Sequence, residues 1–356
     1  MNKLLLGSAA IAGLLLASAP AQAQMELTIG GHSKNYVGFL DQDTAPGQDV
    51  DKFDMLRETE LHFNGESTLG NGLTFGFQVE AEVDGGDDAN TIEESYVYMA
   101  GSWGRINLGS EDGAAYLLQV SAPSADSNID GIRQYINPVN YAAADPVLAG
   151  TIIQDYAQDQ AGYSEKITYL SPNFGGFQLG ASYTPDVEDN QSSTGLAGFT
   201  ADTLAGPSLD EIYEVAGRYE GVMSNFGYAL GAGYSMADSE DAWNVGLDVD
   251  AGPFGIGAVY TDADAGLASQ GVDQDQLVVG VDYTTGPFKF GASYFNEDGD
   301  NNIEVDRYTG GVVYTAGPGL SFRGSVSQIE LDDQGFGLTN GDAEATSVMT
   351  GVQINF

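Results

Sequence analysis

Few side chains in this sequence are suited to catalysis. The chain has two histidines, His32 and His62, and no cysteine. A serine hydrolase needs a histidine beside an exposed serine and an orienting polar group, and no nucleophile-elbow motif accompanies either histidine. The two histidines are not spaced as a metal site, although both could face the same interior. No glycine-rich phosphate loop precedes a helix, so we expect neither an enzyme nor a required cofactor.

Acidic residues dominate the charge of the chain. Its 52 Asp and Glu residues outnumber 11 Lys and Arg residues, which gives a formal net charge of −41. This balance excludes nucleic acid as a partner and favours cations. One segment holds Asp298, Asp300 and Asn302, whose oxygens are the ligands that Ca²⁺ prefers. No complete EF-hand pattern is present, so solvated acidic loops remain the simpler interpretation beside a Ca²⁺ site.

The first residues have the pattern of an export signal. Lys3 supplies a positive charge, residues 4–17 form a short apolar run, and residues 21–23 read Ala-Gln-Ala, a small-x-small cleavage site. We therefore expect a signal peptide over residues 1–23 and a single domain over residues 24–356. No long apolar stretch follows the leader, so a mature chain that sits in a membrane must do so as a closed barrel.

Alternation of apolar and polar side chains runs through most of the chain and predicts strands with two unlike faces. Residues 226–234 read Phe-Gly-Tyr-Ala-Leu-Gly-Ala-Gly-Tyr, and residues 288–294 follow the same pattern. A soluble sandwich would also alternate, but here the connections alternate between tight turns and long polar loops, as in transmembrane barrels. We predict about sixteen strands, over the ranges 26–39, 55–67, 73–83, 92–100, 104–110, 163–171, 176–184, 211–220, 226–236, 241–250, 254–261, 275–284, 288–296, 304–315, 320–330 and 347–356.

The predicted fold is an all-β transmembrane antiparallel β-barrel with short periplasmic turns and long extracellular loops. Tyr and Phe residues at the predicted strand ends indicate aromatic girdles at the two membrane interfaces. One connection, residues 111–162, is unusually long and has no period-two order. Structureless loops of this length are uncommon and usually functional.

Several hairpins resemble those of one known family. Residues 164–183, which contain Ser-Pro-Asn-Phe-Gly-Gly between two strands, are similar to a hairpin of general bacterial porins, particularly those of alphaproteobacteria. Residues 69–80 and 104–109 match two further porin hairpins, and Phe356 matches the outer-membrane assembly signal of the family. The resemblance implies a homotrimer of sixteen-stranded barrels in a Gram-negative outer membrane. It also implies that the third long loop, residues 111–162, folds into each lumen as a constriction.

The resemblance further implies a pore in which acidic residues of the inner loop oppose basic residues of the wall. The acidic set available here is Glu111, Asp112, Asp126, Asp130, Asp145, Asp155 and Asp159. The basic set is thinner and consists of Lys34, Arg57, Arg105, Lys166 and Arg218. Where family members commonly carry a basic residue in the second strand, this chain has Glu58, Glu60 and His62. We therefore expect a weaker or shifted transverse field and a more negative pore.

The sequence thus predicts an outer-membrane porin, a water-filled channel for passive diffusion of small hydrophilic solutes and ions, with a preference for cations. Its expected partners are outer-membrane lipid and lipopolysaccharide, two further copies of itself and the outer-membrane assembly machinery. One alternative is a substrate-selective channel, for instance for sugars, which would need aromatic residues along the lumen. Another is a non-conducting, Ca²⁺-dependent surface or adhesion protein. Stepwise conductance in a planar bilayer separates the channels from this last class.

Overall fold

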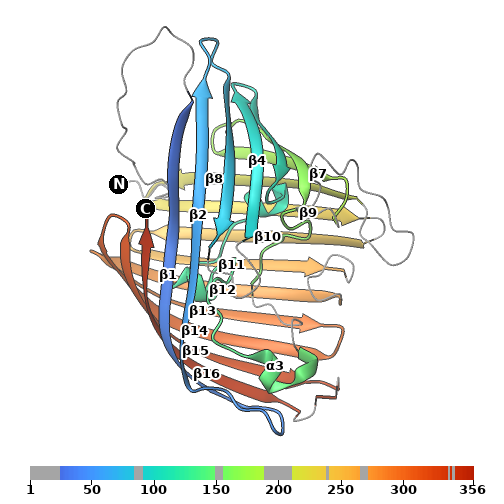
Figure 1. The fold of residues 1–356 in the computed structure, drawn as a ribbon, viewed down its shortest axis with the longest axis vertical. Helices are drawn as coiled ribbons and strands as arrows, with labels where there is room; N and C mark the ends of the chain where they lie inside the picture. The colour runs from blue at the N-terminus through green and yellow to red at the C-terminus, as the bar shows by residue number, and fades with distance from the viewer. Residues whose placement is uncertain are drawn as a thin grey trace.

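The chain forms a closed antiparallel barrel, as predicted. The computed structural model describes residues 25–83, 91–148, 155–187, 211–237, 240–264, 272–335, 337–338 and 341–356. Across these residues there are sixteen strands, each paired with its neighbour in sequence, and β1 pairs with β16 to close the sheet (Figure 1). No helix among the described residues is long and apolar enough to span a membrane. The expected signal peptide lies outside the described residues.

The strand bounds follow the predicted ranges closely. The strands are β1 (Glu26–Gln42), β2 (Phe53–Thr68), β3 (Thr74–Glu82), β4 (Thr91–Gly101), β5 (Gly104–Ser110), β6 (Glu165–Leu170), β7 (Phe177–Thr184), β8 (Ile212–Met223), β9 (Phe226–Ala237), β10 (Glu240–Ala251), β11 (Phe254–Ala263), β12 (Gln274–Thr285), β13 (Phe288–Gly299), β14 (Ile303–Gly317), β15 (Leu320–Asp333) and β16 (Ala343–Asn355). Several continue further on the loop side than predicted. Asp298 of β13 still pairs with Glu304 of β14, because ladder pairing persists where both faces have become polar.

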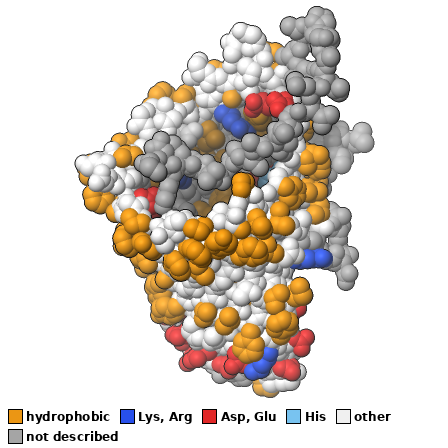
Figure 2. Space-filling view, turned by 90° about the vertical axis from the view of Figure 1, so that its left-hand side faces the viewer, with side chains coloured by type: hydrophobic (Ala, Val, Ile, Leu, Met, Phe, Trp, Pro, Cys, Tyr) orange, Lys and Arg blue, Asp and Glu red, His pale blue; other side chains and the backbone are white. Residues whose placement is uncertain are grey.

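Side chains alternate between the outside and the inside of the barrel along each strand. On β1, Leu27 and Ile29 are 70% and 56% exposed, whereas Lys34 and Tyr36 on the other face are buried. Figure 2 shows apolar side chains gathered in a band across the outside, with acidic side chains gathered at one end. An apolar exterior and a polar interior are the arrangement that a barrel needs in a bilayer.

Aromatic side chains pair across neighbouring strands near both ends of the barrel. On the loop side, the paired rings are Tyr183–Tyr213, Trp243–Tyr260 and Tyr294–Tyr308. On the turn side, they are Tyr219–Tyr228, Phe254–Tyr283 and Phe288–Tyr314. These two sets of rings are the aromatic girdles that the sequence predicted, and they mark the two membrane interfaces.

The end of the chain completes the closure of the sheet. The Gly31 amide donates to the Phe356 carbonyl oxygen at 3.0 Å, and the Phe356 amide donates to the Gly31 carbonyl oxygen at 3.1 Å. Phe356 continues the outward apolar face of β16, beyond Ile354, and its side chain is 43% exposed. The final residue therefore takes part directly in pairing the first strand with the last.

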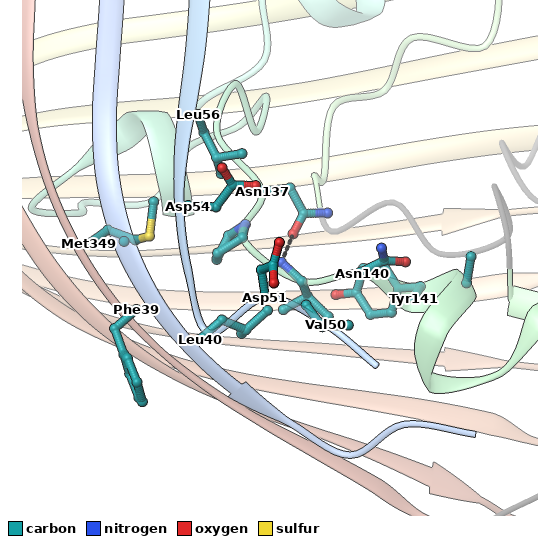
Figure 3. A pocket seen from close by; sticks show the side chains of 14 residues that line it. Phe39, Leu40, Val50, Asp51, Asp54, Leu56, Asn137, Asn140, Tyr141 and Met349 are labelled. Atoms are coloured by element: carbon teal, nitrogen blue, oxygen red, sulfur yellow. Dashed lines mark hydrogen bonds between the residues drawn. The ribbon is translucent and has the colours of Figure 1, made fainter. Parts of the chain in front are cut away.

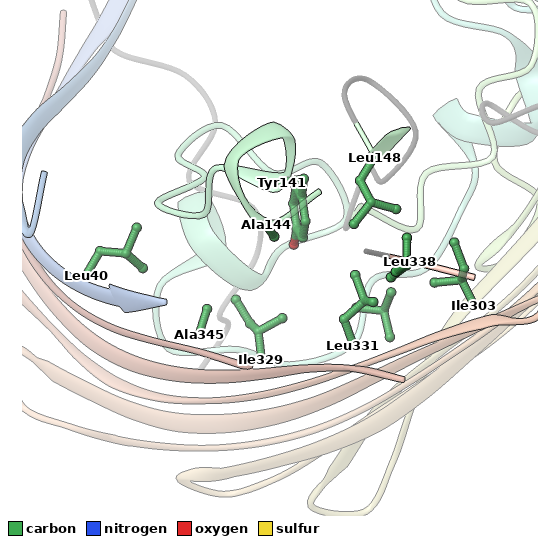
Figure 4. Close-up of a cluster of buried hydrophobic side chains, with 10 residues drawn as sticks. Leu40, Tyr141, Ala144, Leu148, Ile303, Ile329, Leu331, Leu338 and Ala345 are labelled. Carbon is green, nitrogen blue, oxygen red and sulfur yellow. The ribbon is translucent and has the colours of Figure 1, made fainter. Parts of the chain in front are cut away.

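The third long connection folds into the lumen, as predicted. It carries the short helices α1 (Ala114–Leu117), α2 (Ser127–Asp130) and α3 (Tyr141–Ala144) and the 3₁₀ helix η2 (Pro146–Leu148). The segment from α3 to η2 packs on the inner wall. Figure 4 shows Tyr141 and Leu148 beside the wall residues Ile329 and Leu331, in a cluster of buried apolar side chains that also includes Leu40. This cluster anchors one part of the loop by apolar packing, beside hydrogen bonds that join Asn140 to Gln42 and Ala143 to Ala45.

Candidate functional site

The loop between β5 and β6, residues 111–164, crosses the lumen and reaches strands on the far side of the barrel. Asp126, the N-cap of α2, accepts a hydrogen bond from the Asn128 amide and so ends the preceding extended segment. Its carboxylate also accepts a hydrogen bond from the Tyr36 hydroxyl of β1 at 2.8 Å and forms a salt bridge with Arg323 of β15 at 2.7 Å. The start of α2 is therefore fixed to the part of the wall where β15, β16 and β1 meet.

Further polar contacts follow the loop out and back. The Ser293 hydroxyl of β13 donates to Asp130 at 2.7 Å. Further along the chain, the side-chain amide of Gln158 donates hydrogen bonds to the Ser235 hydroxyl of β9 at 2.9 Å and to the Ala242 carbonyl oxygen of β10 at 3.0 Å. The loop is thus held against most of the inner wall from β8 round to β1.

Inward-facing glycines let the loop backbone lie directly on the wall. A Cβ at Gly280 of β12 would overlap the Pro123 carbonyl oxygen, and one at Gly291 of β13 would lie 2.5 Å from the Ala125 nitrogen. Real side chains do not approach that closely, so the loop path depends on these glycines. Glycine inside a strand marks close approach of another backbone. Their recurrence on the polar face of successive strands is the sequence signal that could have predicted this track.

A cationic side chain lies at the centre of the loop. The Arg133 guanidinium contacts Asp112 at 3.0 Å and Asp159 at 2.6 Å. The Tyr116 and Tyr163 rings lie 4.5 Å and 5.2 Å from it. Burial raises the pKa of Asp112, and the Arg133 charge opposes that rise. Arg133 lies in a segment without periodicity, so no pattern in the sequence indicated its position.

The other predicted loop carboxylates differ in their surroundings. Glu111 accepts a hydrogen bond from Asn107 at 2.6 Å, and burial raises its pKa to about 7. Asp145 ends α3 and is buried. The backbone carbonyl oxygen of Asp155 accepts a hydrogen bond from the Gln276 side chain of β12 at 3.1 Å. Most of the predicted set therefore holds the loop to itself or to the wall.

Two of the predicted basic residues face the lumen on the side of β1 and β5. Lys34 contacts the Glu58 carboxylate at 2.6 Å, and its nitrogen lies 3.1 Å from the centre of the Tyr135 ring in the loop. The Arg105 guanidinium lies 3.9 Å from the centre of the Tyr98 ring. Each of these cations therefore has an aromatic face beside it.

Lys166 and Arg218 instead bind the backbone of the loop. The Lys166 ammonium donates to the carbonyl oxygens of Gly162 at 2.7 Å and Ser164 at 2.8 Å. Arg218 of β8 donates to the Gln119 carbonyl oxygen at 2.9 Å. These two residues fix the root and the outgoing arm of the loop.

Arg57 does not line the pore, which corrects the prediction from the sequence. Along β2 the lumen face carries Glu58, whose carboxylate meets Lys34 inside the barrel. Arg57 lies on the opposite face with Phe53 and Met55, both of which are 67% exposed. One step along a strand reverses the face, so the charge of Arg57 is outside.

The two histidines come together on the lumen wall, in contrast to the spacing argument made from the sequence. The β1–β2 register places His32 opposite Glu60, with His62 two residues further along the same face. His62 Nε2 lies 2.8 Å from Glu60, and His32 Nε2 lies 2.8 Å from Glu58 and 3.7 Å from Glu60. Sequence distance hid this cluster, because only the register of the two strands creates it.

The predicted Ca²⁺ residues lie at the connection between β13 and β14. The Asn302 amide donates to the Gly299 carbonyl oxygen at 2.9 Å, and Asn302 has a φ of 61°. The Asp300 amide donates to the Asp273 carbonyl oxygen at 3.0 Å. These residues therefore serve a tight turn, and Ca²⁺ binding by Asp298, Asp300 and Asn302 stays a prediction.

Open spaces flank the loop on both sides. Toward the long loops, a cavity of about 440 Å³ lies between the β1–β2 hairpin and residues 137–142, with Val50, Asp51 and Asp54 on its wall (Figure 3). Toward the short turns, a cavity of about 320 Å³ lies between residues 121–135 and a wall patch of Asp248, Asp282 and Lys289. Both cavities are therefore lined in part by the inner loop.

Comparison with known proteins agrees with this architecture. An outer membrane porin protein of Delftia acidovorans is 28% identical over 182 residues, which is 49% of this chain and 48% of that protein. A Bordetella pertussis outer membrane porin protein is 24% identical over 228 residues, 57% of this chain and 54% of that protein. The chain thus spans about half the length of these curated relatives. Their names and the closed barrel confirm the predicted outer-membrane localisation.

Solved structures share the fold over nearly the whole chain. The anion-selective porin from Comamonas acidovorans matches with a TM-score of 0.62 at 18% identity, covering 94% of this chain and all of that one. A mutant of the Rh. blastica porin matches with a TM-score of 0.60 at 16% identity, over 93% of this chain and all of that one. The family described as Gram-negative porin, whose members are channels rather than enzymes, matches residues 7–334. This chain belongs to the Gram-negative porin family.

Proposed function

We propose that this protein forms a water-filled channel through the outer membrane, in which small hydrophilic solutes and ions diffuse passively and cations are preferred. The observation that carries the proposal is the closed barrel with a wall-anchored loop inside it and cavities between that loop and the wall. Such a geometry sets flux by the width and charge of the gap that the loop leaves.

The cation preference rests on the balance of charge inside the barrel. Several basic side chains of the wall and loop are paired with carboxylates, as in Lys289–Asp282, Arg218–Glu220 and Arg133–Asp159. Because acidic residues exceed basic ones by 41 in the chain, pairing leaves a large acidic excess. Carboxylates on the lipid face are costly, so that excess is concentrated in loops and lumen. A narrow aqueous path focuses their field and enriches cations.

The Comamonas acidovorans porin is anion-selective, which is the opposite preference to the one proposed here. At 18% identity the likeness concerns the fold, and selectivity depends on which side chains line the gap. Here Glu58, Glu60 and Glu80 lie on the inner face of β2 and β3, where the register places Glu60 opposite Glu82 and His62 opposite Glu80. This acidic wall favours cations on the side of the pore opposite β10 to β13.

Trimer formation is supported by an unusual patch on the outside of β1 and β2. There the Ser33 hydroxyl lies 3.0 Å from the Thr59 hydroxyl and accepts a hydrogen bond from the Asn35 side chain at 2.9 Å. Arg57 lies on the same outer face. A polar patch of this kind is unfavourable toward lipid and is expected to be covered by another copy of the barrel. Asn35→Trp should convert heat-resistant oligomers to monomers, whereas Val281→Trp, on the outer face of β12, should leave them intact.

Reconstitution in planar bilayers tests the channel. The expected result is stepwise conductance with a reversal potential of cation-selective sign in a dilute KCl gradient. Absence of conductance from folded protein would favour a non-conducting surface protein, and an anion-selective sign would overturn the charge argument. A sugar-specific channel would show saturable block by one sugar. Contacts with lipopolysaccharide and with the assembly machinery stay predictions.

A further inference from the structure

We propose that His32, Glu60 and His62 form a binding site for a divalent transition-metal ion of the Zn²⁺ type on the inner wall of the barrel. The three side chains come from two adjacent strands, and one potential ligand atom of each lies within 4.8 Å of the others. They form the sole group of three or more His, Cys, Asp or Glu residues within this distance in the part of the chain that the structure describes. The chain has no other histidine.

The Glu60 carboxylate lies between the two imidazole rings. Glu60 Oε1 lies 2.8 Å from His62 Nε2, and Glu60 Oε2 lies 3.7 Å from His32 Nε2. A tetrahedral ion with bonds of about 2.0–2.2 Å holds its ligand atoms roughly 3.3–3.6 Å apart. Small side-chain adjustments therefore bring two nitrogens and one oxygen to that spacing, with an open position toward the lumen.

The donor types decide which ion fits. Imidazole nitrogen suits Zn²⁺, Cu²⁺ and Ni²⁺, whereas Ca²⁺ and Mg²⁺ prefer six or more oxygen ligands. Two histidines and one glutamate are also the ligand set of open zinc sites in proteins. The site should therefore select a transition metal over the alkaline-earth ions that its acidic surroundings would otherwise attract.

Neighbouring carboxylates provide the supporting contacts that metal-bound imidazoles normally have. Glu80 of β3 lies 3.7 Å from His62 Nδ1, the ring nitrogen that does not contact Glu60, and its carboxyl group also hydrogen-bonds Glu60. A small movement of this carboxylate to hydrogen-bond distance of Nδ1 would fix the tautomer and orientation of a coordinating His62. Glu58 contacts both His32 and Lys34, so its charge is shared with a permanent cation and it is the less available ligand.

The site is accessible from the pore and adjoins the inner loop. The His62 and His32 side chains are 28% and 14% exposed, while Glu60 is 7% exposed at the bottom of the cluster. The Tyr135 ring of the loop lies 6.0 Å from the His32 ring. A bound ion would add positive charge where loop and wall approach each other, so it should reduce the flow of cations.

Calorimetric titration of the untagged, folded barrel in detergent with Zn²⁺ alone tests the site without reference to conductance. We expect one Zn²⁺ per chain, retained in excess Ca²⁺. Glu80→Gln should weaken affinity about 10- to 100-fold, as loss of such a supporting contact usually does. Heat-modifiable gel mobility establishes that each variant is folded.

His32→Gln and His62→Gln should each abolish stoichiometric binding, whereas Asp41→Asn, which removes an exposed carboxylate outside the site, should not. Binding that survives in the double histidine variant, or that Ca²⁺ displaces from wild type, would overturn the proposal. In bilayers, micromolar Zn²⁺ should lower wild-type conductance reversibly and leave His62→Gln unchanged. A channel without Zn²⁺ sensitivity but with a calorimetric site would place the ion outside the permeation path and overturn that part of the proposal.

Discussion

Arg323 on β15 and Asp126 in the middle of the inner loop form a salt bridge inside the barrel, with 2.7 Å between Nη1 and Oδ1. The Asp126 side chain is fully buried, and that of Arg323 is 13% exposed. Removal of one partner from such a pair leaves an uncompensated charge, at a cost of about 3–5 kcal/mol. The strand pairings do not depend on this contact, so the cost is borne by the docking of the loop.

Arg323→Gln should therefore release the loop without preventing barrel assembly. We expect higher open-channel noise and a raised mean conductance, measured on single channels, with normal amounts of folded protein. Asp41→Asn is the matched control, since it breaks a pair with Lys52 in which both side chains are more than half exposed. Exposed pairs of this kind contribute little to stability. If the Arg323→Gln channel had wild-type conductance and wild-type open-channel noise, other contacts would suffice to fix the loop.

The glycine track gives a second, steric way to move the loop. Gly280→Val places carbon atoms where the Pro123 carbonyl oxygen lies, and that oxygen belongs to backbone, so the loop must shift. Gly310→Val is the control, because the nearest heavy atom to its added Cβ is 4.0 Å away. We expect faster protease cleavage within residues 111–148 for Gly280→Val alone. Equal cleavage of both variants would contradict the proposed packing of loop on wall.

The strands were predictable from the sequence because alternation is a local property. The range 104–110 coincides with β5, and strand ends elsewhere differ by a few residues where ladders continue into polar loops. The lumen positions of Lys34 and Lys166 follow from the same period. Arg57 was misplaced because it lies near the loop end of β2, where the adjacent apolar residues Met55 and Leu56 leave two possible outer faces in the sequence.

The parts of the site that depend on distant contacts were not predictable. His32 and His62 meet through the register of β1 and β2, which no local pattern specifies. Arg133 binds Asp112 and Asp159 because the loop folds back on itself. The family resemblance placed the loop inside the barrel, but the direction of each carboxylate depends on wall partners that the resemblance does not name.

Phe356 is predicted to be required for efficient assembly. Its amide and carbonyl group exchange hydrogen bonds with Gly31, and its ring extends the outer apolar face of β16. Deletion of Phe356 removes both contributions, so the amount of heat-resistant oligomer in outer-membrane fractions should fall. Phe356→Tyr keeps the ring and the backbone contacts and should assemble normally. Wild-type levels after deletion would exclude a role for the final residue in assembly.

Acidification is predicted to reduce the cation preference of the channel. Burial raises the pKa of Glu111 to about 7 and the pKa values of Asp130 and Asp155 to about 6, in the loop that crosses the lumen. These groups are ionised at about pH 8 and neutral at about pH 5, so the lumen loses negative charge as the pH falls. The reversal potential in a dilute KCl gradient should therefore move toward zero between these two values.

The same raised pKa values fix the sign of the stability effect. A carboxyl group whose pKa is higher in the folded loop than in the unfolded chain favours folding in its protonated form. Its contribution to loop docking is complete below about pH 4, the range of unfolded carboxyl groups, and is lost as the pH rises through about 6 to 7. Open-channel noise should thus be lowest at acidic pH, whereas cation preference should be highest at alkaline pH.

The triple variant Glu111→Gln, Asp130→Asn and Asp155→Asn separates these carboxyl groups from the rest of the acidic pore. Its reversal potential should change much less than that of the wild type between about pH 8 and pH 5, because the three loop groups that titrate in this interval are gone. The measurement needs dilute salt, since the Debye length is about 10 Å at 0.1 M and about 3 Å at 1 M. An unaltered pH response in the triple variant would assign the titration to carboxylates of the wall.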